Sequence, residues 1–300
     1  MKGILLAGGS GTRLQPLTNV VSKQLLPVYS KPMIYYPLST LMLAGIREII
    51  IITTPGDLGQ YQNLLGDGSS LGLELSYQVQ IEPKGITHGV MLAEKFIAGD
   101  QVALILGDNI FHGAGVGEAL RDYQHQKGAT VFATRVRDPS RYGVIEIGED
   151  SEPISIEEKP IHPKSTFAVT GLYFFDNTVF DRSKNVAPSG RGELEITDVH
   201  RSYLKSGTLE VRRLPRGTTW MDTGTIASLA EASDFIKGLE SRHGVLVSCP
   251  EEIAWRNGWI SDDALFRQAA SPGDNEYKSY LLGLLTQERA DRDARSTQFG

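Results

Sequence analysis

The sequence predicts an α/β fold in which helices cover both faces of a doubly wound, mostly parallel sheet, with a helical extension at the C-terminus. Two observations lead to this fold class. Short, wholly apolar runs alternate with longer segments that carry one apolar stripe, which is the strand–helix alternation of a parallel sheet. After residue 241 strand character is lost, and only helical patterns follow.

Five runs in this pattern are predicted to form strands. The runs at 4–7, 49–52 and 102–106 are apolar throughout, as expected of strands that are buried on both faces of a sheet. The run at 73–79 alternates between apolar and polar residues, which favours a strand nearer an edge. The run at 168–175 gives a further strand in the second half of the chain.

The predicted helices fall between these strands and after them. Pro32 is expected to open the first helix, because proline suits the first helical position, and Gly45 is expected to cap its end. Pro250 is expected to open a C-terminal helix in the same way. The other helices are predicted at 57–65, 89–98, 195–205, 225–241, 262–269 and 276–285.

Composition and charge exclude several classes of function. The 300 residues are 40% hydrophobic and 22% charged, which is typical of a globular enzyme with a sizeable core. The net charge of −6 argues against broad nucleic-acid binding, and no apolar run is long enough to span a membrane. The N-terminal apolar run meets Gly8 and Gly9 too soon for a signal peptide. The single cysteine, Cys249, excludes an internal disulfide, so we expect a reducing, cytoplasmic location.

The strongest functional signal is a glycine-rich loop after the first predicted strand. It has the sequence Leu5-Leu6-Ala7-Gly8-Gly9-Ser10-Gly11-Thr12-Arg13-Leu14. Closely spaced glycines let backbone N–H groups approach a phosphate, while Thr12 adds a hydroxyl and Arg13 a fixed charge. No lysine follows the last glycine, and the spacing does not match the dinucleotide fingerprint. The loop therefore predicts binding of nucleotide phosphates at the carboxyl end of a strand, where open α/β sheets bind ligands.

A second segment accompanies this loop. Lys23 follows Arg13 by ten residues, in the run Ser22-Lys23-Gln24-Leu25-Leu26-Pro27-Val28. The combined pattern resembles the sugar-nucleotide pyrophosphorylases, and segments further along narrow the resemblance to the glucose-1-phosphate thymidylyltransferases over residues 1 to about 286. This resemblance implies a Rossmann-like nucleotidyltransferase fold. It also implies an enzyme that converts dTTP and glucose 1-phosphate into dTDP-glucose and pyrophosphate.

The resemblance also implies which residues bind the nucleotide and the metal. The nucleotide-binding set is Leu6, Gly8, Gly9, Gly11, Thr12, Arg13, Gln24, Gln80, Gly85 and Asp108. Gln80 stands where the family recognises the thymine edge, and an amide can both donate to and accept from a base. Asp108 follows the strand at 102–106, and Asp222 lies in a second family segment, 220–224. These two carboxylates, with phosphate oxygens and waters, would suit an octahedral Mg²⁺ site.

The second half of the chain matches the family's sugar-phosphate segments. The implied contacts are Tyr142, Gly143, Glu158, Lys159, Val169 and Arg191. Glu158 would accept hydrogen bonds from sugar hydroxyls, and Lys159 would hold the phosphate as a compact positive charge. The residues implied in catalysis are Arg13, Lys23, Asp108 and Lys159.

One segment departs from the family pattern. The family has a Gly-Leu-Ala-Gln-Ala type of sequence where this chain has Gly85-Ile86-Thr87-His88-Gly89. Thr87 and His88 bring a hydroxyl and an imidazole to the loop beside the nucleoside, where polar groups can favour a ribose 2′-OH. We therefore expect dTTP to remain preferred, with UTP used better than in a Thr87→Ala, His88→Gln variant.

The resemblance further implies regulation and assembly. A second nucleotide site near subunit contacts would include Gly115, Cys249, Glu252, Ile253 and Arg256. It implies a homotetramer inhibited by a downstream dTDP-deoxysugar. The predicted organisation is a catalytic domain at 1–242, a helical extension packed on it at 243–286, and a flexible tail at 287–300.

The reaction needs no protein nucleophile, because the sugar phosphate is already an anion that can attack the α-phosphorus directly. Positioning and charge neutralisation are then the main tasks of the enzyme. Two alternatives remain: a transferase of the same fold that uses UTP or another sugar 1-phosphate, and a non-catalytic sugar-nucleotide sensor. The full set of Arg13, Lys23, Asp108, Lys159 and Asp222 argues against the sensor, since binding alone would not require all of them.

Overall fold

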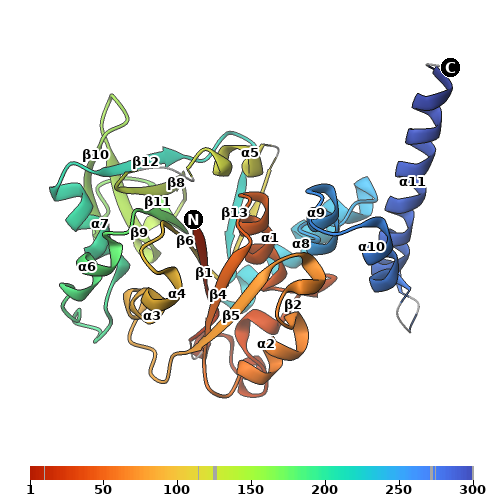
Figure 1. Cartoon of the computed structure of the whole chain (residues 1–300). Coiled ribbons are helices and arrows are strands. Elements are labelled where there is room, and N and C mark those ends of the chain that lie inside the picture. Colours follow the sequence, from red (N-terminus) through yellow and green to blue (C-terminus); the bar gives the residue numbers. More distant parts are fainter. Residues whose placement is uncertain (10, 114, 124–126, 271–272, 274, 299–300) are drawn as a thin grey trace.

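The computed structural model describes residues 1–9, 11–113, 115–123, 127–270, 273 and 275–298. Its main feature is a nine-stranded sheet whose path runs β10-β9-β11-β6-β1-β4-β5, with β8 paired to β11 and β12 paired to β8. Helices lie on both sides of this sheet, and the last three helices gather at one end of the molecule (Figure 1). The predicted α/β fold class is confirmed.

Four parallel strands form the part of the sheet that positions the N-terminal loop. They are β1 (Lys2–Leu6), β4 (Glu48–Thr53), β5 (Glu74–Val79) and β6 (Val102–Leu106). Leu6, the last residue of β1, pairs with Ile52 on one side and with Leu106 on the other. The carboxyl ends of these strands therefore meet at one edge, with β1 in the middle and β5 at the outer end, as predicted.

The alternation of side chains along β1 explains why both faces of the sheet are covered. Ile4 packs into a core on one face, while its neighbour Leu5 packs into a separate core on the other. The first face is covered by α3 (Ile86–Leu92), α4 (Glu94–Ile97), α6 (Val179–Lys184) and α7 (Ile196–Lys205). The opposite face is covered by α1 (Tyr35–Leu43), α2 (Leu58–Leu65) and α5 (Val116–Arg121).

The second half of the chain extends this sheet with mostly antiparallel strands. β11 (Phe167–Phe175) is antiparallel to β6 and joins the two halves. The same sheet also contains β8 (Ala129–Arg135), β9 (Gly143–Ile147), β10 (Pro153–Glu158) and β12 (Leu209–Arg213). Two separate two-stranded sheets pair β2 (Pro27–Val28) with β3 (Lys31–Pro32), and β7 (Asn109–His112) with β13 (Thr219–Asp222). Short 3₁₀ helices lie at η1 (Thr12–Leu14), η2 (Leu17–Asn19), η3 (Lys23–Leu25), η4 (Ser69–Leu71) and η5 (Pro139–Arg141).

Two predicted helix starts were wrong. Pro32 does not open α1, because it pairs with Pro27 in the short β2–β3 hairpin, and α1 begins only at Tyr35. The hairpin is held by a buried ion pair in which Lys31 Nζ lies 2.6 Å from a Glu240 carboxylate oxygen on α8. In addition, α3 begins at Ile86 rather than at residue 89, directly after the left-handed φ of 96° at Gly85.

The C-terminal part is helical, as the sequence predicted. It contains α8 (Ile226–His243), α9 (Pro250–Arg256), α10 (Asp262–Ala269) and α11 (Glu276–Gln298). The predicted helix end at 285 was wrong, since α11 continues to Gln298 and projects away from the sheet (Figure 1). The flexibility of 287–300 stays a prediction. Residues 288–298 contain neither glycine nor proline, and five of the eleven are Ala or Arg, which favour helix. The division of the chain at 242 and 286 stays a prediction.

A buried histidine on α7 makes folding sensitive to acid. His200 stacks on Phe175 and lies tilted against Tyr173, with ring centroids 5.7 and 4.9 Å away. Among the described residues neither ring nitrogen of His200 has a hydrogen-bond partner. Burial lowers the pKa of His200 from 6.5 to about 3. Between these two values the unfolded chain binds the proton better, so the free energy of unfolding falls as the pH drops below 6.5.

We expect a His200→Phe variant to lose this part of the acid sensitivity. One pKa unit corresponds to about 1.4 kcal/mol, so between pH 7 and pH 5 the wild type should lose about 2 kcal/mol more than the variant. Urea denaturation of both proteins at pH 7 and pH 5 measures the difference. The prediction fails if both proteins lose the same stability over this range.

Within the described part of the chain, no helix is both long enough and apolar enough to cross a membrane.

Candidate active site

The glycine-rich loop leaves β1 at the carboxyl edge of the sheet, between the ends of β6 and β4. Gly9 and Gly11 have φ values of 135° and 56°, which favour glycine over residues with a Cβ. At Gly11 a Cβ would also lie 2.8 Å from the Thr18 side chain, whose hydroxyl donates to the Gly11 carbonyl oxygen over 2.8 Å. Thr12 and Arg13 follow on an exposed 3₁₀ turn. Ser10 lies outside the described residues.

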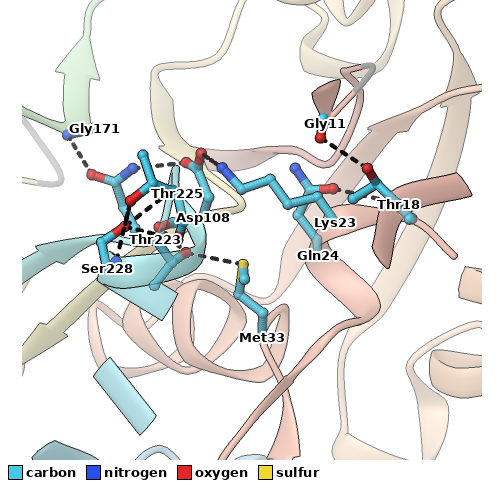
Figure 2. Close-up of polar contacts among 12 residues, drawn as sticks. Gly11, Thr18, Lys23, Gln24, Met33, Asp108, Gly171, Thr223, Thr225 and Ser228 are labelled. Carbon is cyan, nitrogen blue, oxygen red and sulfur yellow. Dashed lines mark hydrogen bonds and ion pairs between the residues drawn. The ribbon is translucent and has the colours of Figure 1, made fainter. Parts of the chain in front are cut away.

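Lys23 and Asp108 meet across this edge. The Lys23 ammonium donates to Asp108 Oδ2, although only 8% of the lysine side chain is exposed. Figure 2 shows the Lys23 side chain pointing directly at the carboxylate. Gln24 is also buried, where its Oε1 accepts from the Ser22 hydroxyl at 3.1 Å and from the Tyr61 hydroxyl at 3.3 Å. The predicted catalytic residues Lys23 and Asp108 and the predicted nucleotide-binding residue Gln24 are thus brought together.

A two-stranded ladder brings the second predicted aspartate to the same place. β13 runs antiparallel to β7, and their register sets Asp222 opposite Asn109, the residue after Asp108. Thr223, the residue after Asp222, fixes the end of β13 next to Asp108. Both its N–H and its hydroxyl donate to the Asp108 carbonyl oxygen, at 3.0 and 2.8 Å (Figure 2). Asp108 and Asp222 therefore lie side by side although they are far apart in the sequence.

The two carboxylates have pKa values shifted in opposite directions. Burial raises the pKa of Asp108, but the neighbouring Lys23 charge and hydrogen bonds from Lys23 and Asn109 outweigh it, so the net shift is downward. The pKa of Asp222 is raised, first by burial and then by the negative charge of Asp108, against the opposing charges of Lys23, Arg13 and Arg141. The charged form of Asp222 is thus disfavoured by burial and by the adjacent Asp108 carboxylate, and a cation bound between the two carboxylates would stabilise it.

This carboxylate pair fits a hard divalent cation. Both side chains offer only oxygens, which are the ligands that Mg²⁺ prefers. In the described part of the chain, no cluster of three or more His, Cys, Asp or Glu side chains is arranged to hold a metal. Two carboxylates leave most of an octahedral shell to waters and to the phosphates of a substrate, as is usual for Mg²⁺.

Asn109 is a buried site residue that the sequence did not assign. Its Nδ2 donates to Asp108 Oδ1 over 2.9 Å, and its Oδ1 accepts from the Gly171 N–H at 3.0 Å and from Trp220 Nε1 at 2.6 Å. These three hydrogen bonds fix the orientation of the Asn109 side chain, and its bond to Asp108 Oδ1 orients the Asp108 carboxylate. The only sequence signal was its position directly after Asp108.

The residues predicted to recognise the base also cluster. Gln80 follows β5 and is 8% exposed. A Cβ on Gly8 would lie 3.2 Å from Gln80 Oε1, and Gln80 Nε2 lies 3.4 Å from the Gly85 carbonyl oxygen. A Cβ on Gly85 would stand 2.6 Å from the Leu194 carbonyl oxygen, so only glycine fits there.

The structure corrects the expectation for the departing segment. Thr87 is completely buried, and its hydroxyl has no hydrogen-bond partner among the described residues, so it does not face a nucleoside. The His88 ring is half-buried and bonds to Gln80, with 2.9 Å between His88 Nδ1 and Gln80 Nε2. The Thr87 hydroxyl is therefore not accessible to a ribose hydroxyl.

The predicted sugar-phosphate residues surround Glu158 at the end of β10. Lys159 Nζ and Arg191 Nη2 each lie 3.5 Å from Glu158 Oε1, while the Thr197 hydroxyl donates to Oε2 over 2.6 Å. A Cβ on Gly143 would lie 3.5 Å from Glu158 Oε2 and 3.8 Å from Val169 Cβ, so these residues are neighbours. Lys159 has a φ of 45°, an uncommon conformation for a side-chain-bearing residue and one that often marks a functional position.

Tyr142 connects this group to the aspartates. Its ring packs edge-on against Trp220, with ring centroids 5.1 Å apart, and Trp220 donates to Asn109. Burial and the charge of Asp222 raise the pKa of Tyr142. The sugar-phosphate residues and the carboxylate pair therefore belong to one continuous site.

The residues predicted for a second site lie elsewhere, on α9 and at the start of α5. Glu252 accepts from Arg256 Nε at 2.7 Å and from the Tyr280 hydroxyl at 2.6 Å, and Gly115 precedes α5 with a φ of 77°. The Cys249 side chain is only 1% exposed, and burial raises the pKa of its thiol, so a contact of this residue with a nucleotide would have to come from its backbone.

The fold and site define a nucleotidyl-transferring enzyme. A family model for nucleotidyl transferases matches residues 2–238, and the chain belongs to that family. Its relatives include the glucose-1-phosphate thymidylyltransferases of Mycolicibacterium smegmatis and Neisseria meningitidis, each 54% identical to the chain. The two alignments cover 96% and 95% of the chain and 100% and 99% of the relatives. The resemblance to this group, inferred from the motifs, is confirmed.

Solved structures agree with this assignment. A Bacillus anthracis structure described as a glucose-1-phosphate thymidylyltransferase in complex with a sucrose has a TM-score of 0.73 and 42% identity, covering 78% of this chain and 94% of that one. A UDP-glucose pyrophosphorylase complexed with UDP-glucose has a TM-score of 0.70 and 26% identity, covering 79% of this chain and 98% of that one.

Proposed function

We propose that the protein transfers a thymidylyl group from dTTP to glucose 1-phosphate, giving dTDP-glucose and pyrophosphate. The observation that carries this proposal is the continuous site in which Asp108, Asp222 and Lys23 meet beside the glycine loop. The identity of the transferred group and of the acceptor is taken from the relatives, which are named glucose-1-phosphate thymidylyltransferases.

The chemistry is a direct displacement. An oxygen of the sugar phosphate forms a bond to the α-phosphorus of dTTP, the bond from that phosphorus to the bridging oxygen breaks, and pyrophosphate leaves. No proton has to be removed from the attacking oxygen, so the protein contributes position and charge. A divalent cation, which we propose to be Mg²⁺, would be held by Asp108 and Asp222 and would neutralise phosphate charge.

The basic residues divide between the two substrates. Arg13 and the amides of the glycine loop are assigned to the triphosphate, and Lys23 to the side from which pyrophosphate leaves. Lys159 and Arg191 are assigned to the sugar phosphate, because both lie within 3.5 Å of Glu158, the proposed acceptor of sugar hydroxyls. Tyr142, between the two groups, would keep the attacking phosphate next to the nucleotide.

The test is pyrophosphate release over a matrix of four nucleoside triphosphates and several sugar 1-phosphates. We expect dTTP with glucose 1-phosphate to give the highest kcat/KM. A second candidate, the use of UTP, is favoured by the likeness to UDP-glucose pyrophosphorylase, but its 26% identity is well below the 54% of the thymidylyltransferases. Preference for UTP in the matrix would overturn the thymidylyl assignment. The absence of turnover with every pair would favour the sensor.

We also propose that the enzyme is a cytoplasmic homotetramer with a regulatory nucleotide site at a subunit contact. Its side chains would come from α9, where the exposed Arg256 pairs with the partly buried Glu252, and its neighbour would be Gly115. Ile253 packs from the same helix against the core that contains α1.

Arg256→Ala is expected to weaken inhibition by a downstream dTDP-deoxysugar about tenfold, which corresponds to the loss of one charge-assisted hydrogen bond. Activity without the inhibitor should stay unchanged, because α9 lies outside the site at the sheet edge. The measurement is an inhibition curve at saturating dTTP, with light scattering to check the oligomer. Inhibition that is purely competitive with dTTP and identical in the variant would contradict the second site.

A further inference from the structure

The orientation of the Gln80 amide decides which base edge the protein can pair with. A glutamine amide has an acceptor oxygen on one side and a donor NH₂ group on the other, so turning it over exchanges the two. Gln80 is buried at the end of β5, with its Oε1 directed at Gly8 in the phosphate loop. In the described part of the chain, this oxygen accepts no hydrogen bond. It remains available to a ligand.

Two neighbours hold the nitrogen side of the amide. The Gly85 carbonyl oxygen, 3.4 Å from Nε2, can only accept a hydrogen bond, so the NH₂ group must face it. His88 Nδ1 lies 2.9 Å from the same Nε2. Because Nε2 is a donor, Nδ1 must present its lone pair, and the His88 proton must be on the other ring nitrogen.

We propose that His88 is a positioning residue that selects the base: its Nδ1 lone pair holds the Gln80 amide with the oxygen toward the nucleotide. This inference rests on the proposed function. Thymine and uracil carry a hydrogen on N3 and need an acceptor there, whereas cytosine has a bare N3 and needs a donor. The fixed amide thus favours thymine and uracil over cytosine, and it does not distinguish the first two from each other.

The surroundings of His88 support this role. The imidazole is half-buried on the first turn of α3. Glu82, whose carboxylate interacts electrostatically with His88, is paired with Lys84 over 2.7 Å. The glutamine side chain is the hydrogen-bond partner of Nδ1. Without this partner, the contact that opposes rotation of the Gln80 amide among the described residues is the longer one with the Gly85 carbonyl oxygen.

The experiment measures the ratio of kcat/KM for dTTP over dCTP. In His88→Phe, which fills the same space without an acceptor, the ratio should fall about three- to tenfold, the equivalent of one hydrogen bond. His88→Gln should restore it, because a second amide can turn its carbonyl oxygen toward Gln80 Nε2. Thr87→Val is the matched control on the same helix, and it should leave the ratio unchanged, because the buried Thr87 hydroxyl has no partner among the described residues.

The same substitution in a Gln80→Glu variant tests whether the effect of His88 depends on the orientation of the Gln80 amide. Gln80→Glu presents only acceptor oxygens, so adding His88→Phe to it should leave the ratio unchanged. If His88→Phe does not fold, His88→Ala replaces it with the same expectation. If the wild type prefers dTTP but the His88 variants keep the wild-type ratio of kcat/KM for dTTP over dCTP, the role of His88 is overturned and the thymidylyl assignment stands. A wild-type ratio near or below one would overturn both this inference and the thymidylyl assignment.

Discussion

Asp108→Asn and Asp222→Asn are each expected to lower turnover about 10³-fold, because each removes one of the two charges that would hold a divalent cation against the phosphates. Loss of a single preorganised charge contact already costs about 10²–10³ in rate, and the pair acts on the same ion. The dependence of the remaining activity on Mg²⁺ concentration should shift to higher concentration in both variants.

The same two variants should change folding stability in opposite directions. Asp108→Asn leaves the buried Lys23 ammonium without its counter-charge and should lower the free energy of unfolding by roughly 1–3 kcal/mol. Asp222→Asn should raise it, because the folded state then no longer holds a carboxylate that is disfavoured by burial and by Asp108. A variant that is more stable and much less active would identify Asp222 as a functional charge kept at the expense of stability.

The raised pKa of Asp222 also predicts a pH dependence. Its folded pKa lies above its unfolded pKa, so its contribution to stability is fully present below the unfolded value and is lost as the pH rises through the folded one. Cation binding requires the deprotonated form, so the affinity for Mg²⁺ should fall on acidification at a higher pH than an ordinary aspartate would give.

Urea denaturation, Mg²⁺ titrations of activity and circular dichroism test these expectations. Asp263→Asn, at an exposed position on α10, is the control for loss of a carboxylate and should change neither turnover nor metal dependence. Unchanged Mg²⁺ titrations in both Asp108→Asn and Asp222→Asn would remove the metal pair. Equal signs of the two stability changes would contradict the electrostatic account.

Arg13→Ala and Lys159→Ala are each expected to lower turnover about 10²–10³-fold. Arg13 follows the glycine loop at an exposed position, and its charge is among those that lower the pKa of Asp222. Because the side chain is exposed, its removal should cost little stability while it removes a charge from the triphosphate. Arg13→Lys keeps the charge but loses the forked donor set, so an intermediate rate is expected.

At Lys159, loss of the charge can be separated from the effect of the unusual backbone conformation. The φ of 45° is easier for asparagine or glycine than for alanine, so Lys159→Asn and Lys159→Gly remove the charge without adding strain. Both should be as inactive as Lys159→Ala, and Lys159→Gly should be at least as stable as the wild type. Single-turnover rates with saturating substrates measure the effect. Near-normal rates in correctly folded Lys159→Asn would show that the charge is not needed.

The sequence by itself predicted the strands that build the site. The unbroken apolar runs in β1, β4 and β6 can be buried only between two layers of helices, so their place in the sheet followed from composition. The glycine loop was predictable for a similar local reason, because closely spaced glycines beside Thr12 and Arg13 suit a phosphate rather than a core. The family relationship, and with it the identity of most site residues, came from these motifs.

Helix boundaries depended on contacts that are remote in the sequence. Pro32 has the local properties of a helix start, but its neighbour Lys31 pairs with Glu240 on α8, and that ion pair keeps the segment in a hairpin. Local preference cannot anticipate a partner that lies two hundred residues away.

Only the tertiary structure decided how the site residues act on one another. The pairing of β13 with β7 brings Asp222 next to Asp108, and Asn109 then bonds to Asp108, to Trp220 and to the backbone of β11. The sequence marked Thr87 and His88 as unusual but assigned both to the nucleoside. The fold buries Thr87 and turns His88 toward Gln80, because burial and hydrogen-bond partners are properties of the packed chain and not of a local pattern.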